Sequence, residues 1–88
     1  MNEAIRQFDL YINTHIDDQH MFIVKHNDNE FVIFDKAFNL FFSRLTKKHN
    51  LTVDEKNKLR VKFKNIILSQ KQLIRLNTVT GRHRGYYI

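Results

Sequence analysis

The C-terminal stretch, residues 51–88, decides the fold of this chain, and its sequence is LTVDEKNKLRVKFKNIILSQKQLIRLNTVTGRHRGYYI. Near its start, Thr52 and Glu55 form the capping-box pattern, in which a threonine and a glutamate three residues later close the beginning of a helix. This pattern predicts a helix over about 53–70. The elements predicted after the helix are a strand, a turn and a returning strand, over residues 72–79, 80–83 and 84–88.

Two more helices and a short β segment are predicted on the N-terminal side of this stretch. Apolar residues recur at helical spacing over 2–16, and the polar residues 17–19 are expected to interrupt that helix. Residues 21–24 have the composition of a strand and lead into a polar turn at 27–29. Residues 31–34 are then either the second arm of a hairpin or the start of the next helix.

Asp35 is the expected N-cap of that next helix, which runs to the polar end at residues 47–50. The predicted order is therefore helix, short β segment, helix, helix and hairpin. This is the order of a winged helix, in which the C-terminal hairpin is the wing. We expect a single α+β domain over residues 1–88 with three helices, because no linker or repeat divides the chain.

Charge is distributed very unevenly along the chain. Residues 1–43 carry three bases and seven acids, a net charge of −4, whereas residues 44–88 carry twelve bases and two acids, a net charge of +10. Seven of the eight phenylalanines lie in the acidic half, at positions that follow the spacing of a core. The basic half is therefore expected to face a polyanion such as nucleic acid.

The composition also excludes several classes of protein and site. The chain has no cysteine, so it has no disulfide, no thiolate zinc site and no thiol nucleophile. His15, His20 and His26 do not have the spacing of a metal site, and no catalytic motif is present, so we expect no metal, no cofactor and no enzyme activity. No stretch is apolar enough to span a membrane and the N-terminus does not resemble a signal peptide, so a cytoplasmic protein without membrane partners is expected.

The helix predicted over 53–70 is the first candidate binding element. Lys56, Arg60 and Lys64 recur every four residues along one edge, where they can follow a nucleic-acid backbone. Asn57, Asn65 and Lys64 are placed near base edges if the helix enters a major groove. Val61 and Leu68 lie opposite the expected core face, where they contact either a partner protein or the first helix.

The C-terminal hairpin is the second candidate. Its expected tip, Arg82, His83 and Arg84, lies between the only two glycines of the chain, Gly81 and Gly85. Glycines allow a sharp turn and a close approach to a surface, so these cations are candidates for phosphate or minor-groove contacts. The alternative is an ordinary hairpin with solvated charge. One of the two adjacent tyrosines should point outward beside Arg84, and Tyr86 is the candidate for stacking on a base.

The C-terminal two-thirds of the chain resembles the winged-helix region that ends many viral and mobile-element primase-helicases. The residues that carry this resemblance are 34–38, 75–77 and the Arg-Gly-aromatic end, 81–88. The size, the basic tail and the Asn, Lys, Ile and Phe content also resemble the family of small middle proteins in the replication operon of staphylococcal cassette chromosome elements. That resemblance implies an A-family DNA polymerase as partner and a role in starting primers.

Three hypotheses follow for the function. The leading one is a non-catalytic accessory subunit in mobile-element DNA replication, which binds single- or double-stranded DNA and docks on a polymerase or helicase. The second is a small winged-helix repressor, which would need a dimer to contact two half-sites. The third is a protein–protein adaptor or inhibitor whose basic face meets an acidic partner.

Overall fold

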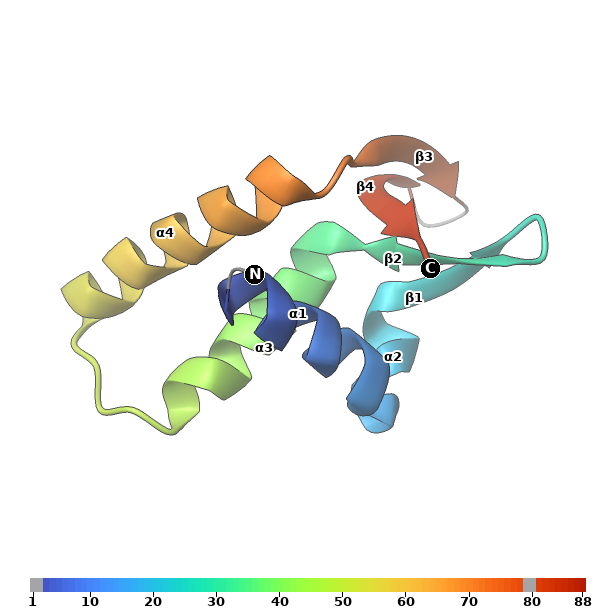
Figure 1. Ribbon diagram of the computed structural model, residues 1–88. Coiled ribbons are helices and arrows are strands. Elements are labelled where there is room, and N and C mark those ends of the chain that lie inside the picture. The colour runs from blue at the N-terminus through green and yellow to red at the C-terminus, as the bar shows by residue number, and fades with distance from the viewer. Residues whose placement is uncertain (1–2, 79–80) are drawn as a thin grey trace.

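The computed structural model describes residues 3–78 and 81–88, which form an α+β domain with a helical part and one antiparallel sheet (Figure 1). Its elements in chain order are α1 (Glu3–Thr14), α2 (Ile16–Phe22), β1 (Ile23–His26), β2 (Asn29–Ile33), α3 (Phe34–Lys47), α4 (Val53–Gln70), β3 (Ile74–Thr78) and β4 (Gly81–Tyr87). The four strands have the order β1-β2-β4-β3. The α+β class is confirmed, but the described residues contain four helices rather than the predicted three.

The additional helix arises because the residues expected to form a loop after α1 start α2 instead. His15 leaves the helical conformation, with φ −87° and ψ 72°, and the chain turns into α2. Asp18 is buried there, because Tyr11 Oη donates to it at 2.8 Å and Arg44 of α3 donates through two nitrogens at 2.5 and 2.8 Å. The polar residues 17–19 do not show by themselves that Asp18 is paired with Arg44, which lies 26 positions later in the sequence. Asn2, where the predicted first helix begins, lies outside the described residues.

The short β segment is a hairpin. Met21 and Phe22, predicted as strand, belong to α2, and β1 starts at Ile23. Asn27 and Asp28 form the two-residue connection with φ of 52° and 66°, the left-handed conformation that a type I′ turn needs at both positions. Residues 31–33 are therefore the second arm of a hairpin, one of the two predicted alternatives.

α3 and α4 start in different ways. Asp35 is not the N-cap of α3, because the helix begins at Phe34 and Ile33 occupies the cap position without a side-chain hydrogen bond. The capping box of α4 is confirmed. Glu55 N donates to Thr52 Oγ1 at 3.2 Å, and Thr52 N donates to Glu55 Oε1 at 3.1 Å.

The C-terminal hairpin differs from the prediction in the position of its turn. Gly81 already begins β4, so Arg82 and His83 are strand residues and not the tip; the predicted turn residue Thr80 and the predicted strand end Val79 lie outside the described residues. Gly81 has a φ of 125°, which favours glycine. Gly85 is needed for another reason, because a Cβ there would lie 1.7 Å from the carbonyl oxygen of Val32 in the neighbouring strand.

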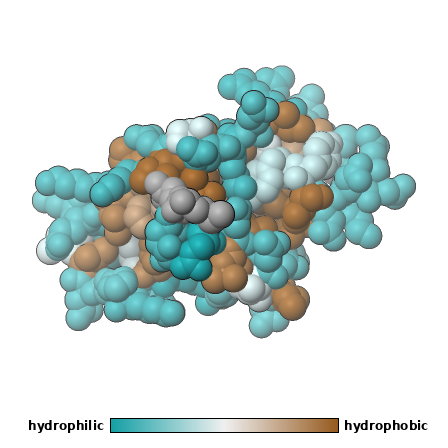
Figure 2. Space-filling model, in the orientation of Figure 1, coloured by the Kyte–Doolittle hydropathy of each residue, from teal (hydrophilic) through white to brown (hydrophobic). Residues whose placement is uncertain are grey.

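The core lies between α1, α2, α3 and the inner face of the sheet, and phenylalanine dominates it. Its buried aromatic members are Phe8, Tyr11, Phe22, Phe34, Phe38, Phe41 and Phe42. From α4, Ile67 is fully buried, and Leu59 and Phe63 are half-buried against the same cluster. On the face shown in Figure 2, hydrophilic side chains dominate both ends of the molecule and apolar patches emerge between them. No helix among the described residues combines the length and apolar character needed to cross a membrane.

Candidate nucleic-acid interface

α4 is a long helix that is mostly exposed. Of its 18 residues, Ile67 is the one that is fully buried in the described structure. Lys56 and Asn57, two of the predicted nucleic-acid contacts, are both exposed near its N-terminal end. Figure 1 shows α4 along one side of the molecule, with a short connection leading from it into β3. The helix and the C-terminal hairpin are therefore consecutive parts of one side of the domain.

Arg60 and Lys64 lie where α4 crosses the aromatic face of α3. Arg60 Nη1 donates to Asn39 Oδ1 at 2.7 Å, and its guanidinium carbon lies 5.2 Å from the centre of the Phe42 ring. Lys64 Nζ lies 5.9 Å from the centre of the Phe38 ring. Both cations are half-buried. Their stems cover the core while their charged groups stay at the surface, as long basic side chains commonly do.

Asp35 connects α4 to the hairpin. Arg84 donates to both of its carboxylate oxygens at 3.0 Å, and Lys64 Nζ lies 3.5 Å from Oδ1. The hydrogen bonds from Arg84 lower the pKa of the Asp35 carboxyl, and the charge of Lys64 acts in the same direction. One carboxylate thus holds two of the predicted contact residues together, although they are 20 positions apart in the sequence.

Three arginines share one face of the hairpin. Arg75 of β3 is paired directly with Arg84 of β4, and Asn77 is paired with Arg82. Directly opposed residues of an antiparallel pair point to the same side, as do residues two apart on one strand. Arg75, Arg82 and Arg84 are therefore on one face, and like charges directly opposite each other destabilise a sheet unless an anion is near.

A hollow of about 340 Å³ lies where this face meets the start of α3. Its lining consists of Ile33, Asp35, Lys36, Arg75, Arg82, His83 and Arg84, of which four are lysine or arginine and one is an acid. We give the name basic surface to six cations of α4 and the hairpin, namely Lys56, Arg60, Lys64, Arg75, Arg82 and Arg84. It can hold phosphate groups by charge and by hydrogen bonds from guanidinium groups.

Two of the predicted hairpin contacts have a different orientation from the one expected. Arg82 is exposed and donates a long 3.4 Å hydrogen bond to Asn77 Oδ1. His83 alternates with Arg82 and Arg84 along the strand, so it points to the other face and is half-buried. The expected tip of three neighbouring cations is therefore wrong, because these residues form a strand.

Tyr86 is not the outward-facing tyrosine. Alternation along β4 puts it on the same inner face as Arg84, where its ring lies 4.5 Å from Lys71 Nζ and its hydroxyl is buried without a hydrogen-bond partner among the described residues. This burial raises the pKa of the Tyr86 hydroxyl. Tyr87 is the exposed ring; its hydroxyl lies 2.9 Å from His26 Nδ1, and it faces away from the arginines. An outward stacking role for Tyr86 on the basic face is therefore wrong.

The two predicted partner contacts on α4 are not equivalent. Val61 is 59% exposed, whereas Leu68 is half-buried and packs against the core cluster. The interpretation of this strip as core is therefore right for Leu68. Val61 remains available at the surface.

Four residues of the site are not among the predicted ones, namely Asp35 as a link, Asn39, Lys36 and Arg75. Arg75 could have been found from the sequence if the hairpin turn had been placed correctly, since its position opposite Arg84 follows from the register. The contact of Asn39 with Arg60 depends on how α3 and α4 pack and has no local sequence signal. Within residues 3–78 and 81–88, no three His, Asp or Glu side chains lie close enough to hold a metal ion.

No protein family, curated protein or solved structure matches this chain. The arrangement of its own residues is therefore what supports a function.

Proposed function

We propose that this chain is a non-catalytic winged-helix accessory subunit that binds nucleic acid through the basic surface and acts beside a replication enzyme. The observation that carries the proposal is the pairing of Arg75 with Arg84 on the same strand face, next to the cations of α4 and with Asp35 as the acid between them. A group of cations that repel one another is stabilised by a bound polyanion.

The topology supports the winged-helix assignment. Strands β2, β4 and β3 are neighbours in the sheet, and α3 and α4 lie between β2 and β3 in the chain. In this assignment α1 is the first helix, α4 is the helix that faces nucleic acid and the β3–β4 hairpin is the wing. The short α2 and β1 are additions to that plan.

Contacts of this kind recognise backbone and not sequence. Lysine and arginine side chains neutralise phosphates and release counterions, which gives affinity that falls steeply with salt. Such a subunit can hold a template or primer end near a catalytic partner, and so contribute position rather than chemistry. With the family resemblance, this favours a cytoplasmic accessory protein of a mobile-element DNA polymerase that enables primer synthesis.

Two variants of equal charge test the proposal. Lys56→Gln/Arg75→Gln/Arg82→Gln changes three exposed cations of the basic surface, whereas Lys25→Gln/Lys47→Gln/Lys48→Gln removes three exposed lysines elsewhere. We expect the first variant to bind a fluorescein-labelled, single-stranded 20-nucleotide DNA at least about tenfold more weakly, with the salt slope reduced by about two. The second variant should stay within about threefold of the wild type. Equal loss in both variants would contradict the proposal.

Two measurements distinguish the accessory subunit from a repressor. Light scattering gives the oligomeric state, and competition between duplexes of different sequence gives the sequence preference. The accessory subunit is expected to be a monomer with little sequence preference. A dimer that prefers one duplex sequence would favour the repressor instead.

A further inference from the structure

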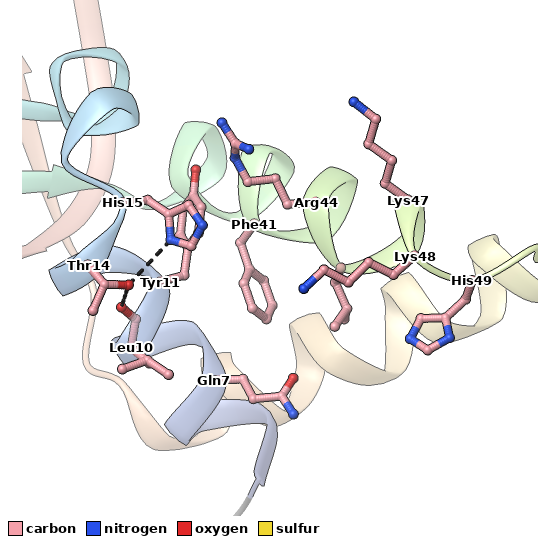
Figure 3. Close-up of a pocket in the computed structure, with 11 residues that line it drawn as sticks. Gln7, Leu10, Tyr11, Thr14, His15, Phe41, Arg44, Lys47, Lys48 and His49 are labelled. Atoms are coloured by element: carbon pink, nitrogen blue, oxygen red, sulfur yellow. Dashed lines mark hydrogen bonds between the residues drawn. The ribbon is translucent and has the colours of Figure 1, made fainter.

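A second hollow lies on a part of the molecule that the basic surface does not use. It has a volume of about 370 Å³, lies between α1 and the C-terminal half of α3, and its lining includes none of the cations of the basic surface (Figure 3). Tyr11, Phe41 and Leu45 contribute apolar surface from the two helices. Leu10, at its edge, is 55% exposed. We call this feature the α1–α3 groove.

The rim of the α1–α3 groove is basic. The titratable residues among its eleven lining residues are Arg44, Lys47, Lys48, His15, His49 and Tyr11, and none of the eleven is an acid. Figure 3 shows the side chain of Lys48 extending over the groove, whereas Lys47 points away from it. Arg44 is already paired with Asp18, so Lys48 is the main cation at the groove without an ion pair within the described structure.

We propose that the α1–α3 groove binds an acidic amphipathic segment of a partner protein. A leucine or phenylalanine of that segment would fill the apolar hollow, and a neighbouring carboxylate would meet Lys48. An amphipathic helix in a groove between helices is a common mode of peptide recognition. Nucleic acid fits the groove less well, because an apolar floor cannot pair with phosphates. The proposal rests on the proposed function only in assuming that a partner protein exists.

The charges next to the α1–α3 groove also determine which way the acidic segment is oriented in it. The adjoining hollow, which shares Thr14, His15 and Arg44 with the α1–α3 groove, is lined by Asp17 and Asp18. Carboxylates of the segment are therefore placed toward Lys48 at the end of α3, and away from the exposed Asp17.

The probe for the test is a fluorescein-labelled fourteen-residue peptide of Leu, Phe, Asp and Glu, with its apolar residues three and four positions apart. A second peptide has Asn and Gln in place of the acids. Fluorescence anisotropy with the full chain is expected to give saturable binding of the acidic peptide and at least about fivefold weaker binding of the neutral one.

Matched variants locate the binding. Lys48→Glu and Leu10→Ala are each expected to weaken the acidic peptide about fivefold. Lys25→Glu makes the same charge change on β1, and Val61→Ala shortens a similarly exposed apolar side chain on α4; both should leave binding within about twofold. Because Leu10 and Lys48 are exposed, their variants should fold, and circular dichroism checks this.

Four outcomes would overturn the inference. The first is that the acidic peptide does not bind the wild type, and the second is that a 20-nucleotide DNA displaces it. The third is that Lys25→Glu weakens peptide binding as much as Lys48→Glu does. The fourth is that Val61→Ala weakens peptide binding and Leu10→Ala does not. The proposed function is tested separately, since Lys56→Gln/Arg75→Gln/Arg82→Gln should weaken DNA binding and leave peptide binding unchanged. If the triple variant binds DNA as well as the wild type but the peptide results are as expected, the nucleic-acid proposal is wrong and the proposal for the α1–α3 groove still holds.

Discussion

α3 and α4 are consecutive helices that both carry phenylalanine and basic residues, yet the protein uses them differently. Six of the 14 residues of α3 are buried, whereas α4 buries one of its 18. In α3 the large side chains Phe34, Phe38, Phe41 and Phe42 fall on one face. In α4 the apolar line through Leu59, Phe63 and Ile67 is narrow, and cations flank it on both sides.

This difference shows what each helix contributes. α3 supplies the apolar surface that drives folding, and α4 lies over it with Arg60 and Lys64 against the rings of Phe42 and Phe38. Most of the surface of α4 is left for solvent or for a partner. A helix with so little burial depends more on its own end structure, and α4 has a capping box whereas the start of α3 has no side-chain cap.

The largest expected effect tests the buried helix against the exposed one. Phe38→Ala removes a ring that is 1% exposed and stacks on Phe34 and Phe42, so it should lower the free energy of unfolding by about 3–5 kcal/mol. Val61→Ala on the exposed side of α4 should change it by less than about 0.5 kcal/mol. Urea unfolding measures both. A similar loss in the two variants would show that α4 is buried against something in solution.

The next effect concerns the ion pair that holds α3 to α2. Asp18→Asn leaves Arg44 without its buried carboxylate and should cost about 1–3 kcal/mol at pH 7. The hydrogen bonds from Arg44 and Tyr11 lower the pKa of Asp18 from 3.8 to about 2. A lowered pKa in the folded state means that this stability is present above the ordinary pKa and is lost as the pH falls toward 2.

Thermal unfolding between pH 7 and pH 2 measures this effect. The difference between wild type and Asp18→Asn should shrink steadily below about pH 5. A constant difference across that range would show that the carboxylate charge is not what stabilises α2.

A smaller effect is expected at the start of α4. Thr52→Ala removes the acceptor for Glu55 N and should cost about 1 kcal/mol. Because α4 has few buried contacts, we expect the loss to appear mostly as faster hydrogen exchange over 55–59, where the amides have acceptors, rather than throughout α3. Thr52→Ser is the matched control, since it keeps the hydroxyl. Equal acceleration in both helices would mean that α4 unfolds only together with the core.

The smallest expected effect is at Asp35. The carboxylate is half exposed, so Asp35→Asn should cost less than about 1 kcal/mol of stability. It also removes the acid that Arg84 and Lys64 share, so the affinity for DNA at low salt should rise about two- to threefold. Asp54→Asn makes the same charge change at an exposed position of α4 and serves as control in the same anisotropy assay. Weaker DNA binding by Asp35→Asn would show that it orients Arg84 rather than competing for it.

Local patterns predicted the parts of this fold that local chemistry determines. The Thr52 capping box, the β1–β2 turn and the phenylalanine core all follow from neighbouring residues and periodicity. The errors lie where distant residues decide the conformation. Asp18 lies within α2 and is paired with Arg44 of α3, and the carbonyl of Val32 in the neighbouring strand requires Gly85; neither contact has a local sequence signal.

The candidate site was predictable in its charge and not in its arrangement. Five of the six cations of the basic surface were identified from spacing on α4 and from their place near the glycines. The link through Asp35 and the opposition of Arg75 and Arg84 depend on tertiary packing and on a hairpin register that the misplaced turn concealed. Tyr86 was expected to point outward because it shares a strand face with Arg84; it does share that face, but this is the inner face of the sheet.

In the proposed function, α4 and the hairpin face nucleic acid, and α1 and the end of α3 do not. Titration of ¹⁵N-labelled protein with a 12-nucleotide DNA, followed by NMR, tests this claim most directly. We predict that the amide shifts concentrate at 56–64, 75 and 81–84, while 4–14 and 44–49 stay unchanged. Shifts concentrated at 4–14 and 44–49 would contradict the claim.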